Sequence, residues 1–269
     1  MSQNAVLTEY EIYKSGLNHS LKIGLVSDLH ERRCEEILSM LKEAKPDLIA
    51  VSGDTLERSS GRDIERQKKK SPIKASAFIA AYCIDRAINF VFRIKNYPLT
   101  ENSYKFLSEA SKLAPVFLSL GNHDDELNDE DMNLINLHGI HLLDNSDTVF
   151  DAFGQNILIG GLSSFYDEEW LERFSKKEGF KILLCHHPEY YDKMIKDSGI
   201  DLILSGHNHG GQIRVFGKGL LSSSGLFPKY DRGVFDNRLV VSTGCANTTA
   251  IPRFKNPREL VIINLIPAN

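Results

Sequence analysis

Five apolar runs of strand length, each followed at once by a short polar cluster, constrain the fold of this chain more than any other feature of its sequence. Near-continuous apolar strands rich in β-branched residues are typical of a sheet that is buried on both faces. In layered α/β proteins ligand-binding residues follow the carboxyl ends of such strands, so we expect the clusters to meet at one place. The runs with their clusters are LKIGLVSDLH (21–30), PDLIAVSGD (46–54), APVFLSLGNHD (114–124), FKILLCHHP (180–188) and IDLILSGHNH (200–209).

Helical patterns lie between these runs. Apolar residues three and four positions apart predict helices within 31–45, 101–113 and 188–198, and Gly199 supplies a natural C-terminal residue for the last of them. Strands that alternate with helices favour an α/β layered fold.

Two stretches depart from this alternation. Residues 140–163 predict a β-hairpin region, and 212–266 contain further strand-like pieces joined by loops rich in Gly, Ser and Pro. They predict a second sheet or an extension of the first. Because no shift in composition divides the chain, we expect residues 1–269 to form a single domain.

A helical insertion is predicted at about 58–98. It begins polar and basic and continues as a helix-length segment over 74–94 that is apolar around most of its circumference. A helix packed on its own domain is the favoured interpretation. The alternatives are a lid, a dimer contact or a helix lying on a membrane surface, with the basic run at 68–70 as its flank. The polar stripe of the segment consists of Tyr82, Asp85, Arg86, Asn89 and Arg93.

The charge balance is weakly acidic. The chain has 32 Lys and Arg against 36 Asp and Glu, which gives a formal net charge of −4. General nucleic-acid binders and binders of anionic membranes usually show a basic excess, so the overall charge counts against both.

The chain carries no targeting signal that the sequence reveals. Its first sixteen residues include acids and lack an apolar core, which predicts neither a signal peptide nor a transit peptide. The longest strongly apolar run, 75–84, is shorter than the roughly 20 residues that a bilayer span needs. The four cysteines form no CxxC pair, which is typical of reduced, buried thiols. We therefore expect a cytoplasmic protein, with the 74–94 helix as its one candidate for peripheral membrane contact.

The polar clusters hold the side chains that divalent metals use. Carboxylate oxygens and neutral imidazole nitrogens suit Mn, Fe, Zn or Co, and the absence of thiolates disfavours a structural zinc site. In DLH and HNH the residues at positions i and i+2 of an extended strand project to the same side, so each pair can converge on one point. The clusters contain Asp28 and His30; Asp54; Asn122, His123 and Asp124; His186 and His187; and His207 and His209.

This ordered set of motifs resembles the signature of the calcineurin-like metallophosphoesterases. The residues that carry it are D28-x-H30, G53-D54, G121-N122-H123-D124, H186 and G206-H-x-H209. The tail GHNHGGQIRVFGKGLL…KYDRG…VSTG…IPRF resembles one branch of bacterial phosphodiesterases, which includes UDP-2,3-diacylglucosamine hydrolase-like members. The resemblance implies two facing mixed β-sheets flanked by helices, in a four-layer sandwich. It also implies two divalent metal ions, with Mn, Fe and Zn the expected identities.

Carried over by position, the resemblance gives each metal its own ligands. Asp28, His30, Asp54 and His209 would hold one ion. Asp54, Asn122, His186 and His207 would hold the other, so that Asp54 bridges the two. Two cations about 3.5–4 Å apart can share a hydroxide and clamp the phosphoryl oxygens for in-line attack on phosphorus.

The remaining residues of the clusters are expected to act without binding metal. His123 is expected to be a general acid or a cationic donor to the phosphoryl group, with Asp124 orienting its imidazole. A carboxylate at a helix N-terminus is the equally weighted alternative for Asp124. His187 is expected to turn away from the metals, although an exchange of roles with His186 stays open.

A metal-dependent phosphodiesterase is the function that these features favour. The loop after Asp54 reads TLERSS and lacks the Asp-Arg-Gly of protein Ser/Thr phosphatases, which disfavours a phosphoprotein substrate. We expect a small or lipid-linked phosphodiester as substrate and no general nucleic-acid binding. The alternatives are a nuclease, a cyclic-nucleotide phosphodiesterase or a non-catalytic metal-binding scaffold. The oligomeric state is left open.

Overall fold

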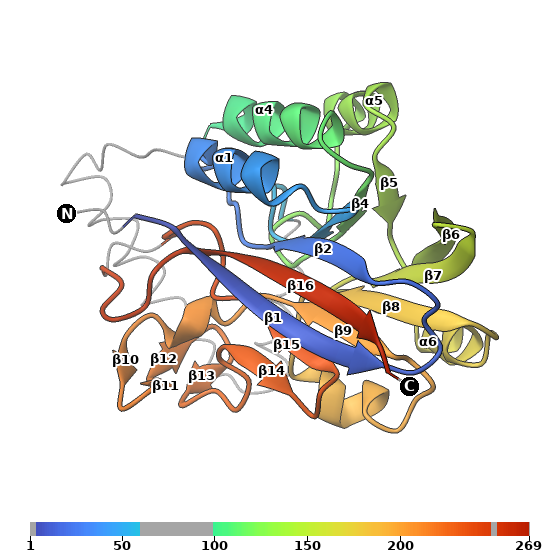
Figure 1. The fold of residues 1–269 in the computed structure, drawn as a ribbon. Helices are drawn as coiled ribbons and strands as arrows, with labels where there is room; N and C mark the ends of the chain where they lie inside the picture. The colour runs from blue at the N-terminus through green and yellow to red at the C-terminus, as the bar shows by residue number, and fades with distance from the viewer. Residues whose placement is uncertain (1–3, 60–98, 249–251, 269) are drawn as a thin grey trace.

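Two mixed β-sheets face each other in the computed structural model, which describes residues 4–59, 99–248 and 252–268 (Figure 1). Helices cover the outer sides of both sheets. The predicted α/β fold of two mixed sheets flanked by helices is confirmed. The helix predicted at 74–94 lies outside the described residues. No helix in the described part of the chain combines the length and the apolar character needed to cross a membrane.

The first sheet has six strands and brings the beginning and the end of the described chain together. The first strand pairs in parallel with the last, which runs antiparallel to the second; the remaining three continue parallel to the second. In spatial order the strands are β1 (Val6–Lys14), β16 (Glu259–Pro267), β2 (Leu21–Val26), β3 (Leu48–Ser52), β4 (Val116–Ser119) and β5 (His141–Leu143).

The second sheet also has six strands, with four parallel strands in its centre and one antiparallel strand at each edge. In spatial order the strands are β14 (Gly233–Phe235), β15 (Leu239–Val241), β9 (Leu202–Ser205), β8 (Phe180–Cys185), β7 (Gln155–Leu162) and β6 (Ser146–Ala152). The predicted hairpin region at 140–163 is therefore divided. Its first piece, β5, joins the first sheet, whereas the β6–β7 hairpin belongs to the second.

The register aligns the ends of the central strands. Val26 at the end of β2 pairs with Val51, and Ser52 at the end of β3 pairs with Ser119 at the end of β4. The polar clusters that follow these strands therefore leave the first sheet at the same edge. β8 and β9 lie side by side and parallel in the second sheet, so the clusters that follow them also leave their sheet at one edge.

A continuous apolar core fills the space between the sheets. Ile23 and Phe117 of the first sheet are buried in it together with Ile182 and Leu204 of the second. Because the alternate residues of these strands are buried beneath the helices, the strands are covered on both faces, as their near-continuous apolar sequences predict.

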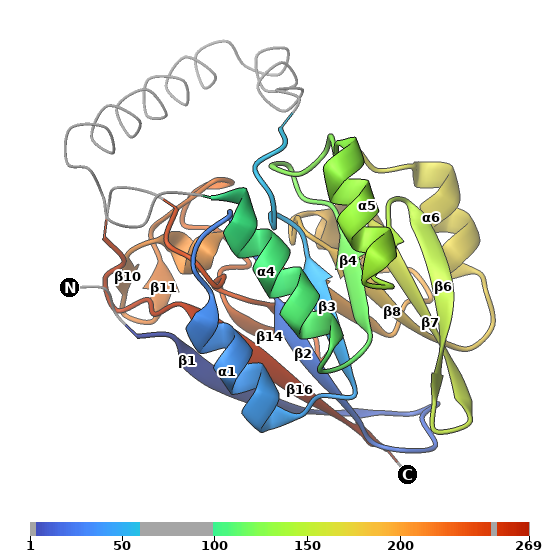
Figure 2. The same ribbon diagram turned by 90° about the horizontal axis from the view of Figure 1, so that it is seen from above.

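The helices form the two outer layers. α1 (Glu35–Ala44) and α4 (Thr100–Ser111) lie side by side over the first sheet (Figure 2). α5 (Asp129–Leu137) follows the fourth strand, and α6 (Glu168–Ser175) packs on the second sheet. The helix predicted within 188–198 is shorter than expected: only a π-helical turn, η1 (Tyr191–Ile195), forms there.

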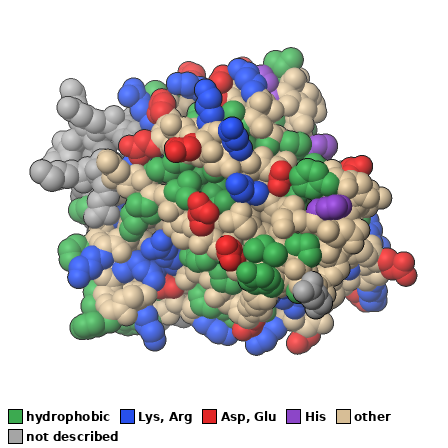
Figure 3. All heavy atoms as spheres, viewed as in Figure 1, with side chains coloured by type: hydrophobic (Ala, Val, Ile, Leu, Met, Phe, Trp, Pro, Cys, Tyr) green, Lys and Arg blue, Asp and Glu red, His purple; other side chains and the backbone are tan. Residues whose placement is uncertain are grey.

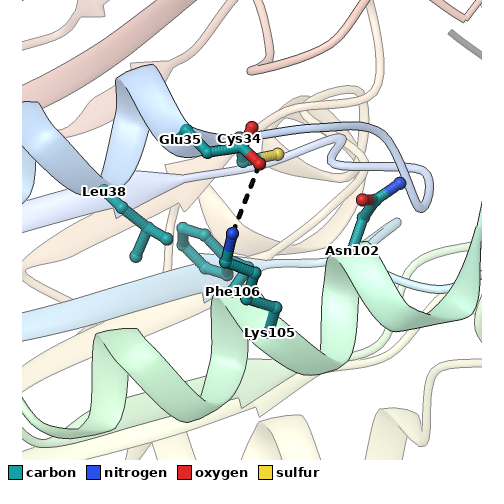
Figure 4. Close-up of a pocket in the computed structure, with 6 residues that line it drawn as sticks. All are labelled: Cys34, Glu35, Leu38, Asn102, Lys105 and Phe106. Carbon is teal, nitrogen blue, oxygen red and sulfur yellow. Dashed lines mark hydrogen bonds and ion pairs between the residues drawn. The ribbon is translucent and has the colours of Figure 1, made fainter.

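A small hollow lies between α1 and α4 (Figure 4). An ion pair of 3.4 Å between Lys105 and Glu35 crosses it, and both side chains are more than half exposed. None of the polar clusters lines this hollow, so the candidate metal ligands lie elsewhere in the fold. Its lining consists of Cys34, Glu35, Leu38, Asn102, Lys105 and Phe106.

Candidate metal centre

The five polar clusters meet where the carboxyl ends of the two sheets approach each other. Within the first sheet the backbone N–H of His30 donates to the carbonyl of Asp54 at 2.9 Å. Within the second, the N–H of Gly206 donates to the carbonyl of His186 at 3.2 Å. The N–H of His207 then crosses between the sheets to the Asp28 carboxylate, also at 3.2 Å. The predicted convergence of the clusters is therefore present in the structure.

One group of metal-binding side chains consists of Asp28, His30 and His209. The Asp28 Oδ1 atom lies 3.6 Å from His209 Nε2 and 3.9 Å from His30 Nε2. Both separations are too long for hydrogen bonds, and two ligands of one cation at about 2.0–2.2 Å lie roughly 3 to 3.6 Å apart. The 3.6 Å separation falls within this range, and the 3.9 Å separation is slightly longer. His30 Nε2 is buried and has no hydrogen-bond partner among the described residues, as expected of an atom that faces a cation.

A second group consists of Asp54, His186 and His207. His186 Nε2 lies 3.0 Å from Asp54 Oδ2 and 3.2 Å from His207 Nδ1. The other ring nitrogen of His186, Nδ1, lies 2.8 Å from the carbonyl of Ser52. Since a carbonyl only accepts, His186 carries a proton on Nδ1 and can offer the lone pair of Nε2 to a metal.

Asp54 lies between the two groups. Its Oδ2 atom is 3.0 Å from His186 Nε2 and 3.5 Å from His30 Nε2. Its Oδ1 atom accepts the backbone N–H of His123 at 2.9 Å, which fixes the carboxylate. Asn122 directly precedes His123 in the sequence. Its side-chain oxygen is buried and has no hydrogen-bond partner among the described residues. The two groups of candidate ligands therefore meet at Asp54.

The charges of the two groups favour cation binding. Burial opposes ionisation of Asp54, but the neighbouring imidazoles, His186 first, outweigh it and hold the pKa of this carboxyl well below its usual range. Burial lowers the pKa of His209 to about 4, which keeps its imidazole neutral at pH 7. Burial also lowers the pKa of His207. Burial opposes a charged His186, but Asp54 outweighs it and raises the pKa of His186 to about 10, so a cation must displace a proton from this imidazole. Ionised carboxylates and neutral imidazoles are the forms that bind metals.

Left-handed backbone, rather than an extended strand, turns these side chains toward one another. The φ angles are 55° at Asp28, 48° at His30, 53° at Asp54, 69° at His207 and 46° at His209. The expected alternation of an extended strand is therefore not the cause of the convergence. Non-glycine residues adopt this conformation at a cost of about 1–3 kcal/mol each, and such strain is concentrated at functional sites.

His123 and Glu57 form a pair that the sequence patterns did not reveal. The His123 Nδ1 atom lies 3.0 Å from Glu57 Oε2, and Glu57 Oε1 lies 2.7 Å from His30 Nδ1. Burial disfavours a charged His123, but Asp54 and then Glu57 outweigh it and raise the pKa of His123 to about 10. The only signal for Glu57 in the sequence was an acid three residues after Asp54, within the loop TLERSS.

Asp124 is not hydrogen bonded to the imidazole that it was expected to orient, although its charge is among those that raise the pKa of His123. Its two carboxylate oxygens accept the backbone N–H groups of Thr55 and Gly121, which tie the loop after β3 to the loop after β4. Glu57, not Asp124, is hydrogen bonded to the imidazole of His123. A helix N-terminal role does not apply either, because the next helix, α5, begins only at Asp129. Asp124 therefore supports the loops that carry the ligands.

His187 lies beside His207, with ring centroids 4.1 Å apart, and with His207 and Glu189 it forms a further group that could hold a metal ion. Its Nε2 atom lies 2.9 Å from the hydroxyl of Ser164, and its Nδ1 atom lies 3.4 Å from Glu189 Oε1. His186 occupies the position beside Asp54, so the geometry does not favour an exchange of roles between the two histidines.

Comparison with known proteins places this chain in a family. The family model for the calcineurin-like phosphoesterases matches residues 21–211, which include all seven predicted metal ligands. The chain therefore belongs to the calcineurin-like phosphoesterase family and is a metallophosphoesterase, a hydrolase of phosphoric esters. Members of this family typically bind divalent metals, in agreement with the two groups of ligands described above.

The similar proteins are distant relatives. The chain is 26% identical to the uncharacterised protein YpbG of Bacillus subtilis, over 86% of this chain and 75% of that protein. It is 25% identical to phosphodiesterase YaeI of Escherichia coli over 72% of this chain and 62% of that protein, so it spans less than two thirds of YaeI. A solved structure of a putative 5′-nucleotidase from Staphylococcus aureus aligns with a TM-score of 0.47 and 11% identity, covering 93% of this chain and 55% of that one.

Proposed function

We propose that this chain is a phosphodiesterase that works with two divalent metal ions, of which Mn, Fe and Zn are the favoured identities. Asp28, His30 and His209 would hold one ion, and Asn122, His186 and His207 the other, with Asp54 shared. The position of Asp54 Oδ2, between His186 Nε2 at 3.0 Å and His30 Nε2 at 3.5 Å, is the observation that carries this proposal.

The bound ions would supply the Lewis acidity that polarises a phosphoryl oxygen and lowers the pKa of an attacking water for in-line displacement. Asn122 contributes an uncharged oxygen, so the site keeps less negative charge against an anionic substrate. Five of the seven ligands, Asp28, His30, Asp54, His186 and His207, are buried, which fixes their positions before the substrate arrives.

His123 is suited to protonate the oxygen that leaves phosphorus. Its side chain is 38% exposed, more than those of the ligand histidines, and so it can reach a substrate at the mouth of the site. Glu57 orients the imidazole through Nδ1 at 3.0 Å, which leaves Nε2 to carry the proton toward the leaving oxygen. Cations bound to Asp54 would weaken the attraction that raises the pKa of His123, and so would bring that pKa nearer to the neutral range.

A diester is favoured over a phosphoprotein on two grounds. The loop after Asp54 reads TLERSS without the Asp-Arg-Gly of protein phosphatases, and the relative YaeI is named a phosphodiesterase. A lipid-linked diester is the proposed substrate class, in keeping with the resemblance of the C-terminal third to bacterial phosphodiesterases of UDP-diacylglucosamine hydrolase type. A nuclease and a cyclic-nucleotide phosphodiesterase are the competing assignments.

The test uses metal-free protein and two model substrates. Bis-p-nitrophenyl phosphate reports diesterase activity and p-nitrophenyl phosphate reports monoesterase activity, each measured after addition of Mn, Fe, Co, Ni or Zn. We expect diester hydrolysis to depend on metal and to be lost in Asp54→Asn, while Asp151→Asn, at an exposed position on β6, retains it. Absence of diester hydrolysis with all five metals would contradict the proposal. A panel of single-stranded DNA, cyclic nucleotides and UDP-sugar lipids then separates the substrate classes.

A further inference from the structure

A cluster of exposed hydrophobic side chains covers the two small hairpins that follow the metal-binding loop. The hairpins consist of β10 (Arg214–Val215) with β11 (Lys218–Gly219) and β12 (Leu221–Ser222) with β13 (Gly225–Leu226). In Figure 3 green hydrophobic side chains lie next to blue Lys and Arg at the lower left, where Figure 1 places these hairpins. We call this the hairpin surface; its hydrophobic members are Val215, Phe216, Leu221, Leu226, Phe227 and Phe254.

The fold joins these residues into one surface. Ile213 forms an isolated bridge with Phe254, and the backbone N–H of Phe227 donates to the carbonyl of Leu220 at 3.0 Å. The loop that carries Phe254 and both hairpins are therefore held together by backbone hydrogen bonds. Scattered exposed apolar residues are ordinary, whereas a contiguous set marks an interaction site.

The exposure of these side chains is not a by-product of folding. Phe216 is 102% exposed, Leu226 72% and Phe227 66%, so none of the three contributes much to the core. Phe216 and Phe227 each have a φ of 51°, a left-handed conformation that favours Gly or Asn. Neither burial nor turn geometry accounts for phenylalanine at these two positions.

Two exposed lysines, Lys218 and Lys255, flank the hydrophobic side chains, while one carboxylate, that of Glu189, lies 3.4 Å from Ser224 Oγ in the turn of the second hairpin. No Asp or Glu occurs between residues 213 and 230, nor between 252 and 258. Arg214 pairs with Asp231 at 3.1 Å and Lys229 with Asp192 at 2.6 Å. Lys218 and Lys255 form no ion pair with any residue that the structure describes, and both are exposed. The net charge of −4 belongs to the whole chain and does not describe this local surface.

The hairpin surface adjoins the candidate metal centre. The 3₁₀ turn η2 (His209–Gly211) contains a predicted ligand and leads directly into β10. In the turn of the second hairpin, Ser223 Oγ donates to the carbonyl of His207 at 3.4 Å and Ser224 Oγ donates to Asn208 Oδ1 at 2.7 Å. A partner bound to the hairpin surface would therefore lie next to the loop that carries His207 and His209.

We propose that the hairpin surface docks the protein on an anionic lipid bilayer. Phe216, Leu226 and Phe227 would enter the interfacial layer, while Lys218 and Lys255 would contact the anionic headgroups. Aromatic and aliphatic side chains flanked by lysines are the combination that binds such interfaces. This docking goes beyond hydrolysis, since it requires neither bound metal nor catalysis.

The experiment is co-sedimentation of the full chain with vesicles of phosphatidylethanolamine and phosphatidylglycerol, compared with vesicles of phosphatidylcholine alone. We expect binding to the anionic vesicles, weakened by salt. The triple variant Phe216→Ser, Leu226→Ser, Phe227→Ser should lower the partition coefficient at least about tenfold. Lys218→Gln with Lys255→Gln should lower it roughly 25-fold, about fivefold for each lysine, and only for the anionic vesicles.

Phe153→Ser is the matched control, because Phe153 is 61% exposed on the turn between β6 and β7, outside the hairpin surface. It should bind vesicles as the unchanged protein does. Far-UV circular dichroism and Tm establish that each variant is folded. Absence of binding to anionic vesicles overturns the proposal, as does full binding by the folded triple variant. A reversible dimer of the unchanged chain that the triple variant abolishes, without vesicle binding, would assign the surface to a second copy instead.

Vesicle binding is read without substrate, so its outcome is independent of the proposed phosphodiesterase activity. A protein that binds vesicles but hydrolyses no diester would retain the docking surface and lose the proposed function. A protein that hydrolyses bis-p-nitrophenyl phosphate but binds no vesicles would retain the proposed function and lack the docking surface.

Discussion

Glu57 lies in the loop after β3 and is hydrogen bonded to the imidazole of His123, with 3.0 Å between Glu57 Oε2 and His123 Nδ1. The other oxygen of the same carboxylate lies 2.7 Å from Nδ1 of His30. One carboxylate therefore orients both a predicted metal ligand and the predicted acid. Outer carboxylates of this kind fix the tautomer of a metal-binding histidine and raise its basicity.

Glu57→Gln is the first prediction. The amide cannot accept hydrogen bonds on both sides, so one histidine loses its acceptor, and neither imidazole is stabilised as strongly in its protonated form. We expect kcat to fall roughly 10- to 100-fold, the range found for residues that support metal ligands. The alkaline limb of the kcat profile should also move to lower pH, since His123 would lose its proton more easily. Glu172→Gln, an exposed change on α6, is the control. An unchanged pH profile would contradict the role of Glu57.

Metal-linked stability provides the second prediction. A cation that binds only the folded chain stabilises it by about 2.7 kcal/mol at a concentration 100 times its Kd. A chain of this length should respond with a rise in Tm of roughly 5–10 °C for each ion. Asp54→Asn should abolish most of the rise, because Asp54 is shared by both groups of ligands. Differential scanning calorimetry with Mn and with EDTA measures it, and an equal rise in both proteins would count against a shared carboxylate.

The strand ends were predictable because each is a local feature of the sequence. An apolar run such as LIAVS identifies a strand, and the Gly-Asp that follows it identifies the turn beyond the strand. β1 was not predicted. Its pattern VLTEYEIYK alternates as expected of a strand, but its partner β16 lies about 250 residues away in the sequence. α5 was missed as well, although Asn128 and Asp131 form a capping box at its start.

The site shows the same division between local and non-local features. Asp28, Asp54 and His186 were identified from the residues that follow apolar runs. Glu57 could not be found in this way, because its function depends on how the loop after β3 folds back onto two histidines from other loops. The partners of Asp124 are backbone groups, which no side-chain motif records.

A buried polar cluster beside the site leads to the third prediction. The Tyr104 hydroxyl donates to Asp131 at 2.7 Å, and Asp131 also accepts from Arg58 Nε at 3.0 Å. Burial and the Asp131 carboxylate raise the pKa of Tyr104 to about 12. Because the folded pKa lies above the unfolded value of 10.0, this contribution to stability is complete below pH 10 and is lost as the pH rises through about 12.

Tyr104→Phe should therefore lower the free energy of unfolding by about 0.5–1.5 kcal/mol at pH 8, the usual contribution of one hydrogen bond. The difference between the two proteins should shrink as the pH rises from 10 to above 12. Urea denaturation at several pH values measures it. Tyr13→Phe is the control, because Tyr13 is 54% exposed and donates only to Glu11 at 3.3 Å. A difference that stays constant with pH would show that the hydroxyl does not titrate as described.

The last prediction concerns the space at Gly206, which lies directly before a predicted ligand. A Cβ atom at this position would stand 2.5 Å from Asp28 Oδ2 and 2.6 Å from Ser27 Cβ. Gly206→Ala must therefore displace the Asp28 carboxylate. Gly24→Ala, on the buried strand β2, is the matched control, because its Cβ would meet only movable side chains, at 2.8 Å from Leu41 Cδ2 and 3.4 Å from Pro46 Cγ.

Overpacking should lower the stability of both metal-free variants by about 1–3 kcal/mol. Only Gly206→Ala should also lose most of the rise in Tm on addition of Mn, because only there does the new methyl group press on a ligand. The two readouts separate loss of packing from loss of metal binding. A Gly206→Ala protein that gains as much from Mn as the Gly24→Ala protein would remove Asp28 from the set of ligands.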